Sequence, residues 1–195
     1  GAGSGYFTFR IAAMVPQGKV LAVDIQPEML AMVEARKLSE NVSNVEGVLG
    51  DLQSTNLPPD SVDVAFLVDA YHEFSHPYEM LESIFTALKP GGRLILVEYR
   101  GEDRNVPIRP LHKMTQAQVK REMDVFDLEF EETLDFLPWR LARRILESAM
   151  RHQIGATLRQ FRIRNQDIGR MLFEIDPHLV ACPEQSKAAI GRRFR

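Results

Sequence analysis

Short apolar runs of strand length alternate with segments of helical periodicity, and this alternation is the feature that most limits the fold. The strand-like runs are residues 20–23, 44–49, 62–68 and 94–97. The predicted helices between them are residues 6–14, 27–39 and 77–88. Strands that alternate with helices at this spacing favour a parallel sheet with helices on both faces. The sequence therefore predicts an α/β fold, with a doubly wound, Rossmann-like, mostly parallel sheet.

The last third of the chain has a weaker pattern. Thr115 is a suitable cap for a helix of about ten residues, and residues 127–137 are expected to form one further strand. Beyond Trp139, apolar residues at helical spacing among arginines predict a basic amphipathic helix, with a short helix near residues 165–173. We expect a core over residues 1–139 and a basic, helical extension over residues 140–195.

Composition narrows the class of protein. Cys182 is the only cysteine, which excludes an internal disulfide framework and agrees with a reducing compartment such as the cytoplasm. No apolar run approaches the roughly 20 residues that cross a bilayer. Residues 1–139 hold 12 Lys and Arg against 22 Asp and Glu, whereas residues 140–195 hold 12 against 5. An acidic core argues against a nucleic-acid partner. The basic tail could bind an anionic surface, although a solvated face is the commoner cause of such a pattern.

The first five residues, Gly1-Ala2-Gly3-Ser4-Gly5, lead directly into a predicted helix. Glycines let a backbone come close to a ligand, and the amides at a helix start are available to bind it. Such a cluster can also be a simple turn. Asp24 follows some twenty residues later at the end of a strand, where a carboxylate grips the ribose hydroxyls of a cofactor in a doubly wound sheet. A helix N-cap is the other role open to Asp24.

The order of motifs resembles the class I S-adenosylmethionine-dependent methyltransferases, particularly the small-molecule branch related to the ubiquinone and menaquinone biosynthesis enzymes. The resemblance covers residues 1–138. Its motifs are Gly1-Ala2-Gly3-Ser4-Gly5, Val23-Asp24-Ile25, Gly50-Asp51-Leu52, Asp69-Ala70-Tyr71-His72-Glu73-Phe74 and Leu88-Lys89-Pro90-Gly91-Gly92-Arg93-Leu94. A nicotinamide-binding fold is the competing interpretation, but its third glycine would fall at Tyr6.

The resemblance implies S-adenosylmethionine as the cofactor. The residues that would contact it are Gly1, Ala2, Gly3, Gly5, Tyr6, Asp24, Ile25, Gly50, Asp51, Leu52, Asp69 and Ala70. In these roles Asp24 would bind the ribose, Asp51 would accept from the adenine amino group, and Asp69 would face the methyl donor. The Lys-Pro-Gly-Gly sequence at residues 89–92 is expected to be structural.

Methyl transfer from a sulfonium needs positioning and, for a hydroxyl or ammonium acceptor, a base. His72, just beyond a predicted strand, is the best-placed candidate, with Tyr71 and His112 as weaker ones. Orientation of a loop or of Glu73 is the alternative role for His72. The remaining histidines, His76, His152 and His178, are interpreted as surface residues. We expect no metal site, since no histidine pair or carboxylate cluster has a convincing ligand spacing.

The acceptor is expected to be a small organic molecule. No Asn-Pro-Pro-Tyr or Asp-Pro-Pro-Tyr sequence follows the strand at residues 62–68, where methyltransferases of nucleobase or glutamine amino groups carry one. A non-catalytic cofactor-binding or regulatory module is the alternative function.

The chain departs from the family pattern at its start. The strand that precedes the glycines in the family is absent from this sequence, together with the acidic residue that ends it. Loss of a central strand leaves two unpaired ladder edges, so we expect a homo-oligomer or aggregate.

Overall fold

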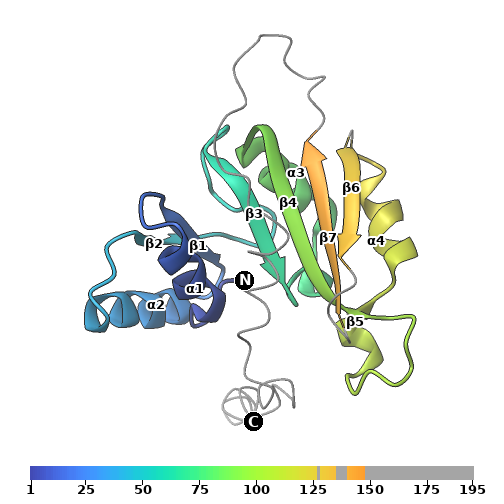
Figure 1. The fold of residues 1–195 in the computed structure, drawn as a ribbon, viewed down its shortest axis with the longest axis horizontal. Helices are drawn as coiled ribbons and strands as arrows, with labels where there is room; N and C mark the ends of the chain where they lie inside the picture. The colour runs from blue at the N-terminus through green and yellow to red at the C-terminus, as the bar shows by residue number, and fades with distance from the viewer. Residues whose placement is uncertain (127, 135–139, 148–195) are drawn as a thin grey trace. The chain divides into compact units, whose positions relative to one another are not determined.

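Two β-sheets with helices packed against them form the part of the chain that the computed structural model describes, residues 1–126, 128–134 and 140–147 (Figure 1). Its α-helices are α1 (Tyr6–Met14), α2 (Pro27–Ser39), α3 (Pro77–Ala87) and α4 (Gln116–Met123). Two 3-10 turns are η1 (Tyr71–Glu73) and η2 (Pro110–His112). Its strands are β1 (Val20–Asp24), β2 (Val45–Leu49), β3 (Val62–Val68), β4 (Leu88–Arg100), β5 (Lys113–Met114), β6 (Leu128–Leu134) and β7 (Arg140–Glu147).

The strands nearest the N-terminus run parallel, as the alternation predicts. β1 pairs with β2 from Val20↔Val45 to Asp24↔Leu49, so both strands end at the same edge. The second sheet has the order β3-β4-β7-β6, with β5 paired to β4 as well. β3 and β4 are parallel, whereas β7 runs antiparallel to both of its neighbours. The predicted α/β fold with a mostly parallel sheet is confirmed.

The two sheets are not joined by a strand ladder within the described residues. β1 pairs only with β2 there, and β3 only with β4. Side chains connect the two sheets and their helices. The rings of Phe7 on α1 and Phe66 on β3, for example, lie edge to face with 5.9 Å between their centroids. One ladder edge of β1 and one of β3 are therefore left without a strand partner in this part of the chain.

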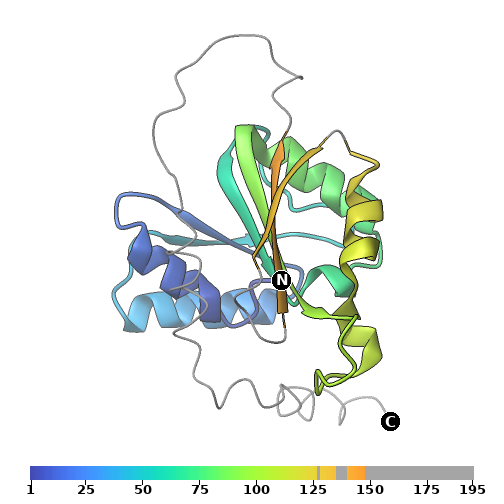
Figure 2. The same cartoon turned by 45° about the vertical axis from the view of Figure 1, so that its right-hand side comes forward.

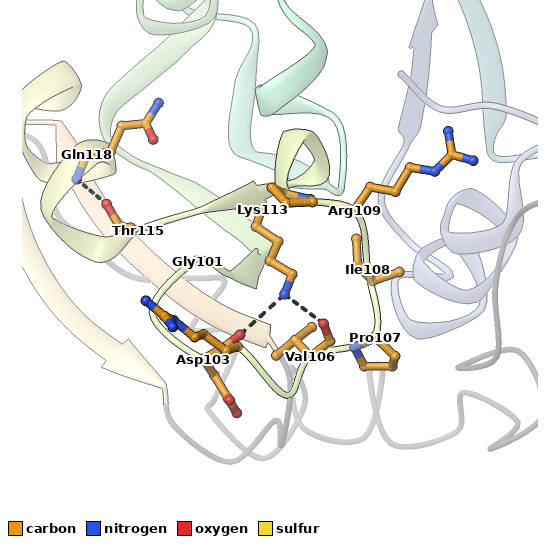
Figure 3. A pocket seen from close by; sticks show the side chains of 11 residues that line it. Gly101, Asp103, Val106, Pro107, Ile108, Arg109, Lys113, Thr115 and Gln118 are labelled. Carbon is orange, nitrogen blue, oxygen red and sulfur yellow. Dashed lines mark hydrogen bonds between the residues drawn. The ribbon is translucent and has the colours of Figure 1, made fainter.

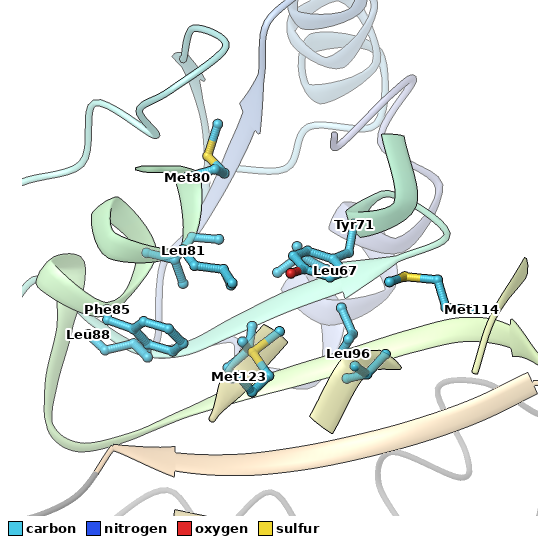
Figure 4. Packing of buried hydrophobic residues seen from close by; sticks show 12 residues of the cluster. Leu67, Tyr71, Met80, Leu81, Phe85, Leu88, Leu96, Met114 and Met123 are labelled. Atoms are coloured by element: carbon cyan, nitrogen blue, oxygen red, sulfur yellow. The ribbon is translucent and has the colours of Figure 1, made fainter. Parts of the chain in front are cut away.

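Helices bury the apolar side chains of each sheet separately. On the larger sheet, Leu67 and Leu96 pack with residues of α3 and α4. Figure 2 shows these helices against one face, and Figure 4 shows the packed side chains. The buried cluster on this face is Leu67, Tyr71, Met80, Leu81, Ile84, Phe85, Leu88, Leu94, Leu96, Met114, Val119 and Met123. A smaller cluster joins α1 and α2 to their sheet and consists of Phe9, Ala12, Ala22, Val33 and Val45. None of the described helices is long and apolar enough to cross a membrane.

Two short sequence signals have local structural roles. Thr115 caps α4, since its hydroxyl accepts from the Gln118 amide at 3.0 Å. After α3, Gly91 has φ 76°, and a Cβ on Gly92 would lie 2.7 Å from the Lys89 carbonyl oxygen. Both glycines lie within β4 and are required by its first part, where the register with β3 shifts.

The predicted helix beyond Trp139 is wrong for residues 140–147, which form β7. This strand pairs with β4 from Tyr99↔Arg140 to Arg93↔Leu146 and with β6 on its other side. Hydrogen bonding to two neighbouring strands outweighs the local helical spacing. The remainder of the predicted tail helix and the short helix near residues 165–173 lie outside the described residues.

Candidate functional site

The glycine loop wraps back onto the end of β1. The Ala2 amide donates to the Val23 carbonyl at 2.9 Å, and the Gly3 amide donates to Asp24 Oδ2 at 2.8 Å. Gly3 and Gly5 have φ 55° and 83°, which a residue with a side chain rarely adopts. A Cβ on Gly5 would also lie 2.8 Å from the Phe9 ring. The loop therefore needs its glycines for its own path as well as for access to a ligand.

Asp24 is the residue on which the loops converge. Its carboxylate accepts from the Gly3 amide and, through Oδ1, from the Gln26 amide at 2.9 Å, while its carbonyl accepts from the Gly50 amide at 3.0 Å. The side chain is 5% exposed. A carboxylate has about four acceptor positions, so the two amides leave capacity for two hydroxyl donors. Asp24 joins the glycine loop, α2 and the end of β2.

The segment after β2 places a carboxylate beside exposed apolar side chains. A Cβ on Gly50 would lie 2.9 Å from the Ser54 carbonyl oxygen, so this turn excludes larger residues. Asp51 Oδ1 accepts from the Gln53 and Ser54 amides at 2.7 Å each. Leu52 is 55% exposed, and Ile25 and Leu49 are also exposed. Solvent-exposed leucine and isoleucine next to two strand ends offer apolar surface to a flat ring.

Tyr6 supplies a buried polar atom with unused bonding capacity. Its hydroxyl is buried and has no hydrogen-bond partner within the described part of the chain. The guanidinium of Arg10 lies over the ring, 3.8 Å from its centroid. Because a buried hydroxyl without a partner costs free energy, a polar group of a bound molecule would be stabilising here.

Asp69 and Ala70 lie close to the start of the glycine loop. A Cβ on Gly1 would lie 3.3 Å from the Ala70 side chain. Asp69 has φ 48°, unusual for a residue other than glycine, and its amide donates to the Val97 carbonyl at 2.8 Å. A strained conformation of this kind recurs at functional sites. The end of β3 and the glycine loop therefore border one region.

His72, the predicted catalytic residue, is held by a buried carboxylate that the sequence analysis missed. Glu98 on β4 is 0% exposed, and its Oε2 lies 2.6 Å from His72 Nδ1. Its Oε1 accepts from the Tyr71 amide at 2.9 Å. Burial lowers the pKa of His72, but the hydrogen bond to Glu98 and its charge outweigh this effect, so the pKa is raised. Glu98 fixes the orientation of His72.

The structure also brings His112 to this position from forty residues away. His112 Nδ1 lies 3.0 Å from His72 Nε2, and the two rings are nearly perpendicular. Tyr71 points elsewhere: its hydroxyl donates to Glu122 Oε2 at 2.7 Å. Burial, with a smaller effect of Glu122, raises the pKa of Tyr71. His72 and His112 form a pair, whereas the Tyr71 ring belongs to the buried core.

A signal for Glu98 exists in the sequence, because this carboxylate follows a buried apolar run directly. The β3–β4 register pairs Val68 with Val97, so Glu98 falls next to the end of β3, where Tyr71 and His72 follow. The residue could have been found only by combining the two strand ends with their register.

An open cleft of about 630 Å³ is lined by residues between Gly101 and Gln118, including Pro110 of η2 (Figure 3). Lys113 lines this cleft, and its ammonium group donates to the carbonyl oxygens of Asp103 and Val106 at 3.3 and 2.6 Å. The lining lies within residues 101–118 and includes Arg104 and Arg109. Lys113 thus holds the loop that precedes His112 in place.

Comparison with known proteins gives concordant matches. A family model described as a methyltransferase domain matches residues 1–167. A demethylmenaquinone methyltransferase of Lactococcus lactis is 27% identical over 146 residues, which are 74% of this chain and 52% of that protein. A ubiquinone/menaquinone biosynthesis C-methyltransferase of Ectopseudomonas mendocina is 33% identical over 99 residues, 50% of this chain and 39% of that protein. The chain spans about half the length of the curated relatives that it matches, or less.

Solved structures share the fold. A SAM dependent methyltransferase from Aquifex aeolicus superposes with a TM-score of 0.70 at 23% identity, covering 75% of this chain and 78% of that chain. An S-adenosylmethionine dependent methyltransferase from Mesorhizobium loti gives 0.61 at 19% identity, covering 75% and 88%. These matches confirm the family and the fold that the motifs predict. The chain belongs to the methyltransferase domain family and has the Rossmann-like fold of S-adenosylmethionine-dependent methyltransferases.

Proposed function

We propose that the protein transfers a methyl group from S-adenosylmethionine to a small organic acceptor. The observation that carries this proposal is the convergence on Asp24, whose carboxylate and carbonyl tie the glycine loop to the ends of β1 and β2. The names of the curated relatives, which are quinone methyltransferases, support a small-molecule acceptor. Bound S-adenosylmethionine would supply an electrophilic methyl group on a sulfonium.

The residues fit that cofactor. Gly1, Ala2, Gly3 and Gly5 would bind the methionine part. The Tyr6 hydroxyl, which has no hydrogen-bond partner among the described residues, would be available to a polar group. Asp24 would accept from the ribose hydroxyls, and Ile25 would lie against the sugar. Gly50 allows the tight turn after β2. Asp51 would accept a hydrogen bond from the adenine amino group, and the exposed Leu52 would cover the adenine ring. Asp69 and Ala70 would border the methyl donor.

On the acceptor side we propose His72 and His112 as the catalytic pair. An acceptor O–H, N–H or activated C–H loses a proton as its atom bonds to the methyl carbon, and the neutral thioether leaves. Glu98 holds His72 Nδ1 at 2.6 Å, so Nε2, which lies 3.0 Å from His112 Nδ1, would take up that proton together with His112. Tyr71, with its hydroxyl committed to Glu122, acts by positioning η1.

Turnover on a panel of hydroxylated aromatic, amine and quinol acceptors tests the proposal. Production of the demethylated cofactor that depends on one acceptor and on His72 supports it. Cofactor binding without turnover on any acceptor would instead support the non-catalytic module. A homo-oligomer in the cytoplasm remains our expectation for its state and location.

A further inference from the structure

Three potential metal ligands from two separate turns converge beside the proposed acceptor site. His72 Nε2 and a carboxylate oxygen of Glu73, both on η1, lie with His112 Nδ1 on η2 within 4.8 Å of one another. The two imidazole nitrogens are 3.0 Å apart, and His72 Nε2 is 4.0 Å from Glu73 Oε1. Forty residues of chain separate the two histidines, so their spacing in the sequence gives no sign of a site.

The orientation of His72 is that of a metal-binding histidine. Histidines that bind a metal almost always donate their other ring N–H to a carboxylate or carbonyl. Glu98 provides this partner, because its Oε2 lies 2.6 Å from His72 Nδ1. With the proton on Nδ1, the lone pair of Nε2 points toward His112. The completely buried Glu98 thus prepares His72 as a ligand through Nε2.

The two imidazole nitrogens are close enough either for an N–H···N hydrogen bond or for a shared metal ion. Two nitrogen lone pairs that face each other at 3.0 Å repel unless a proton or a metal ion lies between them. Zinc–nitrogen bonds of about 2.0–2.1 Å at tetrahedral angles place two ligand nitrogens about 3.3 Å apart. A small movement of one ring is therefore sufficient to exchange the proton for a metal ion.

The donor atoms identify the class of metal. Two imidazole nitrogens and one carboxylate suit borderline divalent ions such as Zn²⁺ and Co²⁺, whereas Mg²⁺ and Ca²⁺ prefer oxygen ligands alone. The Glu73 side chain is 58% exposed, so solvent reaches the cluster from that side. Three protein ligands also leave one position of a tetrahedral ion open for water or for an oxygen of a bound molecule.

We propose that His72, Glu73 and His112 form a binding site for a divalent transition-metal ion, with Glu98 orienting His72. This inference goes beyond the proposed function, because the cluster can bind a metal whether or not the chain transfers methyl groups. In the metal-bound state His72 would be a ligand, and the ion would lower the pKa of an acceptor hydroxyl in the open position, whose proton would pass to the solvent on the exposed Glu73 side.

Titration of the chelator-treated chain with Co²⁺, followed by visible absorption, tests the site, and calorimetry with Zn²⁺ measures its affinity. We expect one ion per chain with the absorption of a tetrahedral Co²⁺ complex. His112→Ala should weaken binding at least tenfold, and His72→Ala should do the same. His76→Ala is the matched control, because His76 lies near η1 and bonds to Ser75 instead of to the cluster. It should bind Co²⁺ as the unchanged chain does.

Circular dichroism melts of each variant show whether it still folds. Glu73→Gln tests the third ligand, and because Glu73 is exposed, this change should not disturb the core. Absence of Co²⁺ binding at millimolar concentration, or equal binding by the chain and His112→Ala, would overturn the proposal. S-adenosylmethionine binding, measured on the same samples, reports on the proposed function separately.

Discussion

Asp24 has both a structural and a proposed binding role. Its carboxylate accepts hydrogen bonds from two backbone amides, and we propose that it also accepts from the ribose hydroxyls. We predict that Asp24→Ala weakens S-adenosylmethionine binding by about 1.5–3 kcal/mol, the range for hydrogen bonds to charged groups. Asp51→Ala should cost less, because one adenine contact is lost. Isothermal calorimetry measures both.

Asp63→Ala is the control for these variants, since Asp63 is exposed and pairs with Lys89 on the surface. It should leave cofactor affinity unchanged. Asp24→Ala should also lower thermal stability, because the amides of Gly3 and Gln26 lose their acceptor. Unchanged cofactor affinity in a folded Asp24→Ala chain would mean that Asp24 serves only to hold the Gly3 and Gln26 amides.

Glu98 is predicted to act through His72 and not through the cofactor. Glu98→Gln keeps the size of the side chain but removes the charge that holds His72 Nδ1. Loss of a group that orients a functional histidine typically costs about 10- to 100-fold in activity, and we expect this loss in kcat. Steady-state kinetics on an identified acceptor, with cofactor affinity measured in parallel, check it.

The exposed Glu79 on α3 provides the comparison, as Glu79→Gln should retain full kcat. A Glu98→Gln chain that turns over normally, or that loses cofactor affinity and kcat together, would argue that Glu98 only supports the fold.

Among the helices, strands and loops, the features that depend on neighbouring residues could be predicted from the sequence. The glycine loop, the Asp24 turn and the Thr115 cap depend on contacts within a few residues or on one strand end. The strand β7 could not be predicted in this way, because the apolar and basic residues at 140–147 have the spacing of a helix. Their strand conformation depends on β4 and β6, which pair with them from elsewhere in the chain.

Backbone nuclear Overhauser effects test β7 directly. We expect contacts between the backbone protons of Val97 and Ala142, which are paired in the β4–β7 register. Residues 140–147 should lack the Hα(i) to HN(i+3) contacts of a helix, whereas α4 should show them as an internal reference. Helical contacts through residues 140–147 would restore the interpretation from sequence.

In the candidate site, too, some residues could be predicted from neighbouring positions and others could not. Each residue that we propose for the cofactor lies in a motif recognisable along the chain. The contacts of Glu98 and Glu122 and the His72–His112 pair depend instead on distant elements. The spacing between His72 and His112 carries no signal, since it reflects the path of β4 and the loop after it.

For the whole molecule, the unpaired edges of β1 and β3 within the described residues lead to a prediction about association. Backbone amides and carbonyls at such edges need partners. We predict that the 195-residue chain oligomerises or aggregates through these edges.

Size exclusion with light scattering measures the association, and thermal melts with and without cofactor measure the stabilisation. A monodisperse monomer with a cooperative melt and full cofactor affinity would show that these edges need no additional strand.

Calorimetry tests most directly whether the chain binds S-adenosylmethionine at the loops that converge on Asp24. Titration with the cofactor and with its demethylated product should give saturable binding of both at one site per chain, weakened by Asp24→Ala and unchanged by Asp63→Ala. No heat of binding from either compound at millimolar concentration would contradict the account for this chain.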